Sequence, residues 1–252
     1  MSDHLQLSDR SWVDLFKAPE HLTAPAVVER LWRLCPPERG RIRRSGITLC
    51  SYTFSGHTLV GGPVPPELQP FLDWANSLPQ YGGRFNEVLV NWYQDGRDWI
   101  GTHSDSIAQL LPDSPILSLS LGDTRTFRIC PARRGGLAPH TPAAAAKGSR
   151  LPAVDNSSSS SGGAGGGSLK TSPDWRQDIE LPHGTVLVMG GAMQTEFTHE
   201  VPQLPPSVVR QRLASGEGPG RRINVTLRQF APEAAAREGA PPAKRQRAAA
   251  AG

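Results

Sequence analysis

The segment His103-Ser104-Asp105 places an imidazole and a carboxylate two positions apart. Alternate side chains of an extended segment project to the same face, so both groups could bind one metal ion. A third ligand must come from elsewhere, and His199, in the loop before the last strand pattern, is the best candidate. Two imidazoles and one carboxylate form a facial triad, which leaves positions on Fe(II) open for a co-substrate and O2. The spacing therefore predicts a mononuclear iron site.

An H-x-D pair is a common pattern, and it leaves alternatives open. His103 could instead be a histidine in a surface turn. His57, His140 and His183 could also supply the third ligand, although His140 lies in a low-complexity stretch and His183 in a Pro-His-Gly turn. His199 is preferred because the loop before a final strand is a reasonable place for a ligand at the mouth of a barrel.

A second constellation lies in residues 222–228, which alternate polar and apolar side chains as a two-faced strand does. One face carries four polar residues, namely Arg222, Asn224, Thr226 and Arg228. A guanidinium binds a carboxylate in a bidentate fork, so two arginines and an amide on one face suit a dicarboxylate. The alternative is a polar face that meets solvent.

Asn91 and Tyr93 show the same alternation on another strand pattern, shortly before the H-x-D pair and across an Asp-Gly turn. Taken alone they are ordinary polar residues of a strand. Together with the arginine-bearing strand they could complete one pocket.

The elements that must position these residues are chiefly strands. Segments rich in β-branched, aliphatic and aromatic residues, separated by turn residues, predict strands at 47–59, 86–93, 115–121, 126–130, 178–189 and 222–230. Proline-marked starts predict helices at 25–34 and 67–76. The fold class expected is mainly β (α+β), a double-stranded β-helix or jelly roll with flanking N-terminal helices.

Composition divides the chain into ordered and low-complexity parts. Gly (26) and Pro (24) are frequent among the 252 residues, and 133–173 is dominated by Ala, Gly, Ser and Pro. Such a segment buries too little apolar surface to offset its ordering entropy. We expect an N-terminal extension (1–24), one domain (25–230) interrupted by a disordered insertion (133–173), and a disordered basic tail (231–252).

Charge and cysteine content indicate the compartment. The formal charge of +4 permits a polyanionic partner without requiring one. Three cysteines without a C-x-x-C pair, a charged N-terminus and the lack of a long apolar run predict an intracellular protein, nuclear or cytoplasmic, that does not enter membranes. We also expect a monomer. The short basic run at 244–247 would suit either a nuclear address or a solubilising tail.

Taken in order, the motifs between about residues 45 and 230 resemble the AlkB family of dioxygenases. The resemblance rests on NWYQDG (91–96), IGTHSD (100–105), SPILSLSLG (114–122), LPHGTVLVM (181–189), the His199 segment and the R-x-N-x-T-x-R strand. It implies a double-stranded β-helix that oxidises alkyl groups on bases of DNA or RNA, with Fe(II), 2-oxoglutarate and O2. DNA repair is the default role, and the demethylation releases formaldehyde.

The resemblance also implies roles for residues. His103, Asp105 and His199 would bind iron. The C1 carboxylate end of 2-oxoglutarate would meet Arg228 and Asn224, and the distal carboxylate would meet Arg222, Asn91 and Tyr93, with Thr226 on the same strand face.

On the substrate side, YTFSG (52–56) resembles the family's Y-x-(F/Y)-S-G segment. Tyr52 and Phe54 would sandwich a base, since stacking on an aromatic ring contributes about 1–3 kcal/mol per base. Arg43 and Arg44 could contact phosphates, or belong to a solvated loop. Ile107 stands where many family members have an acid, which puts the choice of alkylated base in question.

Two other functions remain open. The same scaffold could hydroxylate a protein or a small molecule, or the chain could be a catalytically inactive nucleic-acid-binding module. A complete metal triad beside two arginines argues against the inactive module.

Overall fold

The computed structural model describes residues 3–34, 43–48, 52–54, 57–59, 62–132, 175–216 and 220–231. For the segments between 43 and 59 it describes the backbone alone. The expected insertion at 133–173 and the tail from residue 232 onward lie outside these ranges.

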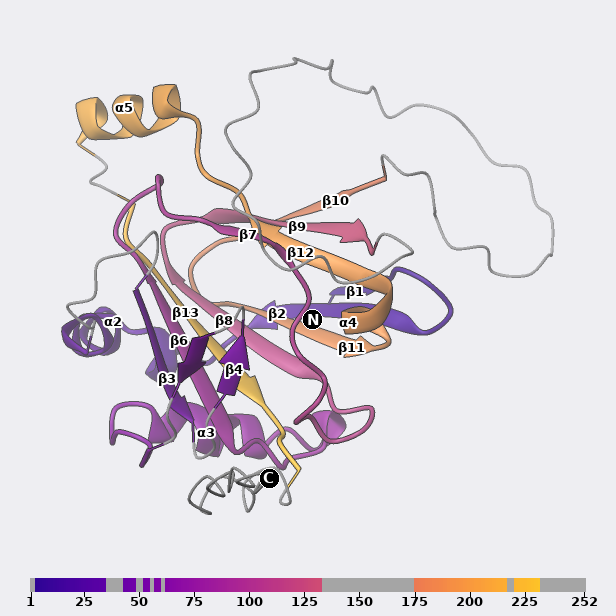
Figure 1. The fold of residues 1–252 in the computed structure, drawn as a ribbon. Helices are drawn as coiled ribbons and strands as arrows, with labels where there is room; N and C mark the ends of the chain where they lie inside the picture. The colour runs from indigo at the N-terminus through magenta and orange to yellow at the C-terminus, as the bar shows by residue number, and fades with distance from the viewer. Residues whose placement is uncertain are drawn as a thin grey trace, which may run out of the picture.

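Within the described ranges, the strands form two antiparallel sheets and a small hairpin (Figure 1). The first sheet has the order β1 (Asp3–Gln6), β2 (Ser11–Lys17), β11 (Thr185–Gly191), β8 (Ile116–Gly122), β13 (Arg222–Arg228), β6 (Glu87–Tyr93) and β3 (Arg43–Thr48). The second has the order β10 (Gln177–Leu181), β9 (Arg125–Pro131), β12 (Phe197–Val201) and β7 (Ile100–His103). The hairpin is β4 (Tyr52–Phe54) and β5 (His57–Leu59). This architecture confirms the predicted jelly roll.

Helices α2 (Pro25–Arg33) and α3 (Gln69–Asn76) cover the outer face of the first sheet (Figure 1). Pro25 suits the first turn of α2 because its missing N–H would have no partner there. Leu31 of α2 and Phe71 of α3 are buried against the sheet, and the Trp92 indole donates a hydrogen bond of 3.0 Å to the Leu31 carbonyl. The other helical elements are α1 (Glu20–Thr23), a 3-10 turn (Pro79–Tyr81), α4 (Met193–Glu196) and α5 (Pro206–Ser215).

Alternation along β13 gives the first sheet two different faces. Ile223, Val225 and Leu227 pack in the core under the helices. The side chains between them turn toward the second sheet, as the period of two in a strand requires. A second apolar core, which includes Phe127 and Leu187, fills part of the space between the sheets. The polar face of β13 is therefore enclosed rather than solvated.

Several expected elements differ from the observed ones. The two predicted helices are confirmed, at Pro25–Arg33 and Gln69–Asn76. The single strand expected at 47–59 is wrong, because β3, β4 and β5 divide the segment, and the one expected at 178–189 is broken by a turn between β10 and β11. Strands β7 and β12 were not predicted, since both are short and place polar side chains where apolar ones mark a buried face.

The N-terminal residues contribute strands as well. β1 and β2 lie within the segment set apart as an extension, and β2 pairs along its whole length with β11 of the first sheet. Among the described residues, no helix is long and apolar enough to cross a membrane.

Candidate metal and co-substrate site

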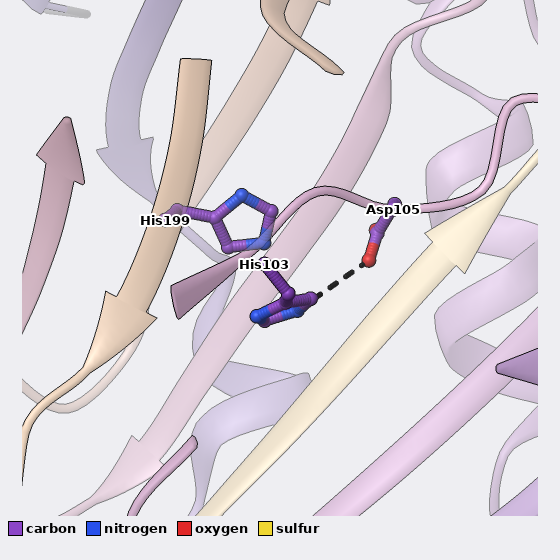
Figure 2. Close-up of side chains that lie close together, drawn as sticks. All are labelled: His103, Asp105 and His199. Carbon is purple, nitrogen blue, oxygen red and sulfur yellow. Dashed lines mark ion pairs between the residues drawn. The ribbon is translucent and has the colours of Figure 1, made fainter. Parts of the chain in front are cut away.

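Three side chains from β7, the loop after it and β12 converge between the two sheets (Figure 2). His103 ends β7, and its Cα partner on the antiparallel strand β12 is His199. Asp105 follows β7 by two residues and turns back toward the same point (Figure 2). The local H-x-D spacing and one strand pairing therefore bring the three residues together.

The donor atoms of these residues lie within 4.8 Å of one another. His103 Nε2 is 3.7 Å from a carboxylate oxygen of Asp105, and the ring centroids of His103 and His199 are 4.4 Å apart. Asp105 and His199 are buried, while His103 is partly exposed. Two imidazoles and a carboxylate at this separation form a set that can hold Fe(II) on one face.

Neighbouring groups orient these side chains. His103 Nδ1 donates to the Gly101 carbonyl at 2.8 Å, which directs Nε2 toward the site. The backbone N–H of Asp105 donates to Gln194 Oε1 at 2.8 Å, and the Phe127 ring stacks on His199 at 5.1 Å.

Arg228 joins the three candidate metal ligands to the polar strand. Its Nη2 donates to Asp105 at 2.8 Å, and its Nη1 donates to Glu87 at 3.1 Å. Glu87 is fully buried, and its Cα is the cross-strand partner of Arg228 in the β6–β13 pairing. A carboxylate–guanidinium–carboxylate chain therefore fixes the orientation of Asp105.

The pKa values follow from this environment. Burial alone would raise the pKa of Asp105, but the charge of Arg228, with His199 and His103, holds it below its usual range. Burial, together with His103, lowers the pKa of His199 to about 3. Burial raises the pKa of Glu87 although Arg228 opposes the shift. At neutral pH the triad thus has the ionisation that metal ligation requires, a neutral His199 and an ionised Asp105.

The polar face of β13 forms one wall of the space between the two sheets. Register pairs Arg222 with Tyr93 and Asn224 with Asn91, so four of the residues expected around a dicarboxylate lie side by side. The Arg222 guanidinium carbon lies 4.8 Å from the centroid of the Tyr93 ring.

Several polar atoms of this wall lack a hydrogen-bond partner although they are buried. Among the described residues they include the Tyr93 hydroxyl, Asn91 Oδ1, and Nε and Nη1 of Arg222. Arg222 is otherwise held by one bond, from Nη2 to Ser120 Oγ at 2.9 Å. Buried polar groups in proteins are almost always satisfied, so the unpaired donors of Arg222 and Tyr93 fit an anionic ligand.

Asn224 and Thr226 are instead engaged with protein groups. Asn224 Nδ2 donates to Ser118 Oγ at 2.7 Å, and the Thr226 hydroxyl donates to Asn224 Oδ1 at 3.0 Å. Both side chains are buried on the same face as Arg222.

The family is identified by the match of the 2OG-Fe(II) oxygenase superfamily model to residues 23–228. The chain belongs to the 2OG-Fe(II) oxygenase superfamily. This oxygenase is 29% identical over 226 residues to the DNA oxidative demethylase ALKBH2 of Homo sapiens. The aligned region covers 88% of this chain and 69% of the relative. The same protein of Mus musculus is 28% identical over 228 residues, covering 89% and 76%.

A further relative is the alpha-ketoglutarate-dependent dioxygenase alkB homolog 3 of Rattus norvegicus, 30% identical over 152 residues, which covers 60% of this oxygenase and 38% of the relative. The AlkB-like resemblance is thereby confirmed. The protein is a dioxygenase, and the cofactor and co-substrates of its family are Fe(II), 2-oxoglutarate and O2. The facial donor set and the unpaired cationic donors of the wall fit both iron and a dicarboxylate.

Of the remaining residues singled out from the sequence, the structure describes the side chains of His183 and Ile107. His183 accepts a hydrogen bond from the Gly122 N–H at 2.9 Å and also contacts Thr23 O at 3.0 Å, so it supports a turn. Ile107 is 54% exposed. The side chains of His57 and of the substrate candidates, together with the whole of His140, lie outside the described residues; the substrate candidates are Tyr52, Phe54, Arg43 and Arg44.

Sequence reasoning missed Glu87, Gln194 and Arg125. Glu87 shares the strand face of Asn91 and Tyr93, so the same alternation could have revealed it. Arg125 lies two residues before Phe127 and four before Ile129, so the strand period places it on the same inward face. Gln194 has no such signal, because the fold alone brings it to Asp105.

Proposed function

We propose that this oxygenase is an oxidative demethylase of N-alkylated bases in nucleic acid, with DNA as the favoured substrate. The observation that carries the proposal is a facial donor set beside buried, unpaired cationic donors, in a chain similar over most of its length to DNA oxidative demethylases.

In this proposal His103, Asp105 and His199 hold Fe(II). Bound iron, with 2-oxoglutarate as the electron donor, supplies the activation of O2 that hydroxylates the N-alkyl carbon; succinate and CO2 leave, and the hydroxymethyl base releases formaldehyde. The protein's part is orientation. Arg228 and Gln194 fix Asp105, and the Gly101 carbonyl fixes His103.

The co-substrate would lie along the polar face of β13. Arg222, Tyr93 and Asn91 would receive its distal carboxylate, since unpaired donors of Arg222 and Tyr93 are buried there. Arg228 and Asn224 would lie toward its C1 carboxylate, and Arg228 already adjoins the metal ligand Asp105. Thr226 would hold Asn224 in place.

The nucleic acid would enter from the exposed side of the metal site. A base within a duplex is out of reach, so the enzyme must flip it out or accept a single strand. We propose Tyr52 and Phe54 as the aromatic platform and Arg43 and Arg44 as phosphate contacts. The exposed Ile107 supplies no charge to attract a cationic alkylated base.

The test is a demethylation assay with matched oligonucleotides that carry N-methyladenine or N-methylcytosine, as single- and double-stranded DNA and RNA. We expect formaldehyde and succinate in equal amounts, which require Fe(II) and 2-oxoglutarate, and the greatest yield with DNA. Asp105→Asn is the control without a complete ligand set.

Succinate release that none of the oligonucleotides stimulates would count against a nucleic-acid demethylase and favour a hydroxylase of a protein or small molecule. No succinate under any condition, despite measured metal binding, would favour an inactive binding module.

A further inference from the structure

Arg125 is a buried arginine that forms no salt bridge with a carboxylate in the described structure. It begins β9 and is 1% exposed. Its Nη2 donates to two backbone carbonyls, those of Asp98 at 2.8 Å and Pro202 at 2.6 Å. Among the described residues, Nε and Nη1 have no hydrogen-bond partner.

The two carboxylates whose charges act on Arg125, those of Asp123 and Asp98, make their own contacts with other groups. The Asp123 carboxylate pairs with Arg212 at 2.5 Å, and the Asp98 carboxylate accepts the backbone N–H of Gln94 at 2.5 Å. Removing a charge from water is costly unless the charge is paired. Nε and Nη1 of Arg125 are therefore buried cationic donors that an anionic ligand would satisfy.

The guanidinium lies next to the distal end of the candidate co-substrate pocket. Its carbon is 5.6 Å from the centroid of the Tyr93 ring, and the Arg222 guanidinium lies 4.8 Å from the same ring. The Tyr93 hydroxyl is itself unpaired. Burial lowers the pKa of Arg125, and the neighbouring charge of Arg222 lowers it further, although Tyr93, Asp123 and Asp98 oppose the shift. Two buried cations thus stand close enough to repel each other.

The inward face of β9 runs from the candidate metal ligands to the distal end of the candidate co-substrate pocket. Phe127 stacks on His199, whereas Arg125, two residues earlier on the same face, meets Tyr93. The inward face of one strand thus presents an apolar ring at the metal and a cation away from it.

We propose that Arg125 is a second cationic binding residue for the distal carboxylate of the co-substrate, and that it selects 2-oxo acids that carry this carboxylate. The inference rests on the proposed co-substrate roles of Arg222 and Tyr93. Nε and Nη1 are the donors available to the carboxylate, while Nη2 anchors the side chain to the two loops.

The test measures binding rather than turnover, with the full chain loaded with Mn(II) in place of Fe(II). Calorimetry compares 2-oxoglutarate with 2-oxopentanoate, which has the same carbon skeleton but a methyl group in place of the distal carboxylate. Hydrogen bonds to charged groups contribute enough that Arg125→Met should weaken 2-oxoglutarate binding about tenfold or more. Binding of 2-oxopentanoate should be unchanged, so the ratio of the two affinities falls.

Arg128→Met is the matched control on the same strand. Arg128 faces outward and pairs with Asp178 at 2.7 Å, so its loss should leave both affinities unchanged. If Arg125→Met does not fold, Arg125→Gln provides the same comparison, since it removes the charge but keeps a polar side chain at this position.

An unchanged affinity ratio in the Arg125 variant would overturn the inference and leave Arg125 a structural clamp. Arg222→Met separates this failure from failure of the proposed pocket. If Arg222→Met alone lowers the ratio, only the role of Arg125 is wrong; if neither variant lowers it, the pocket assignment is wrong as well.

Discussion

His103 and His199 are Cα partners in the pairing of β7 with β12, and their rings stand 4.4 Å apart. The register becomes irregular directly after this pair, between His199 and Val201. A shift of one residue would turn His199 to the opposite face of the strand. The register of this pair therefore decides whether the three candidate metal ligands can meet.

The first prediction concerns metal binding. His103→Gln should reduce affinity for Mn(II) by more than about 100-fold, because changes to groups that merely orient ligands already cost about 10–100-fold. Calorimetry measures the affinity, and circular dichroism should show an intact fold. His183→Gln is the control, since His183 supports a turn away from the site; equal Mn(II) affinity in the two variants would reject the ligand assignment.

The second prediction concerns Glu87. Glu87→Gln should weaken Mn(II) binding about 10–100-fold although Glu87 is no ligand, because Arg228 would lose one of the two carboxylates that orient it toward Asp105. Glu180→Gln, at an exposed carboxylate on β10, is the control. If Glu87→Gln binds Mn(II) with wild-type affinity, the remaining contacts of Asp105 are sufficient to orient it, and the role given to Glu87 is wrong.

The third prediction concerns Arg228. Arg228→Ala should raise the 2-oxoglutarate concentration needed for half-maximal succinate release by about tenfold or more, since hydrogen bonds to charged groups are lost. Titration of the co-substrate at saturating iron measures the effect. An unchanged requirement would restrict Arg228 to the orientation of Asp105.

The fourth prediction concerns pH. Because the pKa of His199 is lowered to about 3, the unfolded chain takes up a proton between pH 6.5 and 3 that the folded metal-free protein does not. The free energy of unfolding should therefore fall with pH below 6.5, by at most about 1.4 kcal/mol per pH unit from this group. Urea unfolding of the metal-free protein at pH 7 and 5 measures the fall. His199→Asn should show a smaller pH dependence; an equal one would assign the fall to other groups.

The fifth prediction concerns Glu196, directly before β12. Glu196 accepts hydrogen bonds from the hydroxyls of Ser8 and Ser11 and from Arg10, so it ties the β1–β2 turn to the strand of His199. Burial opposes the shift, but these donors hold the pKa of Glu196 below its usual range.

Glu196→Gln should therefore lower the melting temperature at pH 7, where the carboxylate is ionised. The difference from the wild type should shrink as pH falls through the ordinary carboxyl range toward the lowered pKa, because the stabilisation is lost on protonation. Thermal unfolding at pH 7 and 4 tests this. A difference that stays constant between these values would show that charge at Glu196 is unimportant.

Much of the candidate site could be predicted from the sequence. Strict alternation at 222–228 places Arg222 and Arg228 on one face, and the H-x-D spacing places two candidate ligands together, because both are consequences of the strand period. The same periodicity and the proline-marked helix starts predicted both helices α2 and α3, strands β6, β8, β9 and β13, and the jelly-roll class.

Only the tertiary structure decided which partners these residues meet. His199 became the third member of the set through its pairing with His103, and Glu87 reached Arg228 through the β6–β13 register. Arg125 came to the Tyr93 ring because the second sheet packs over the first. Such contacts join positions far apart in the chain, and no local spacing encodes the packing that brings them together.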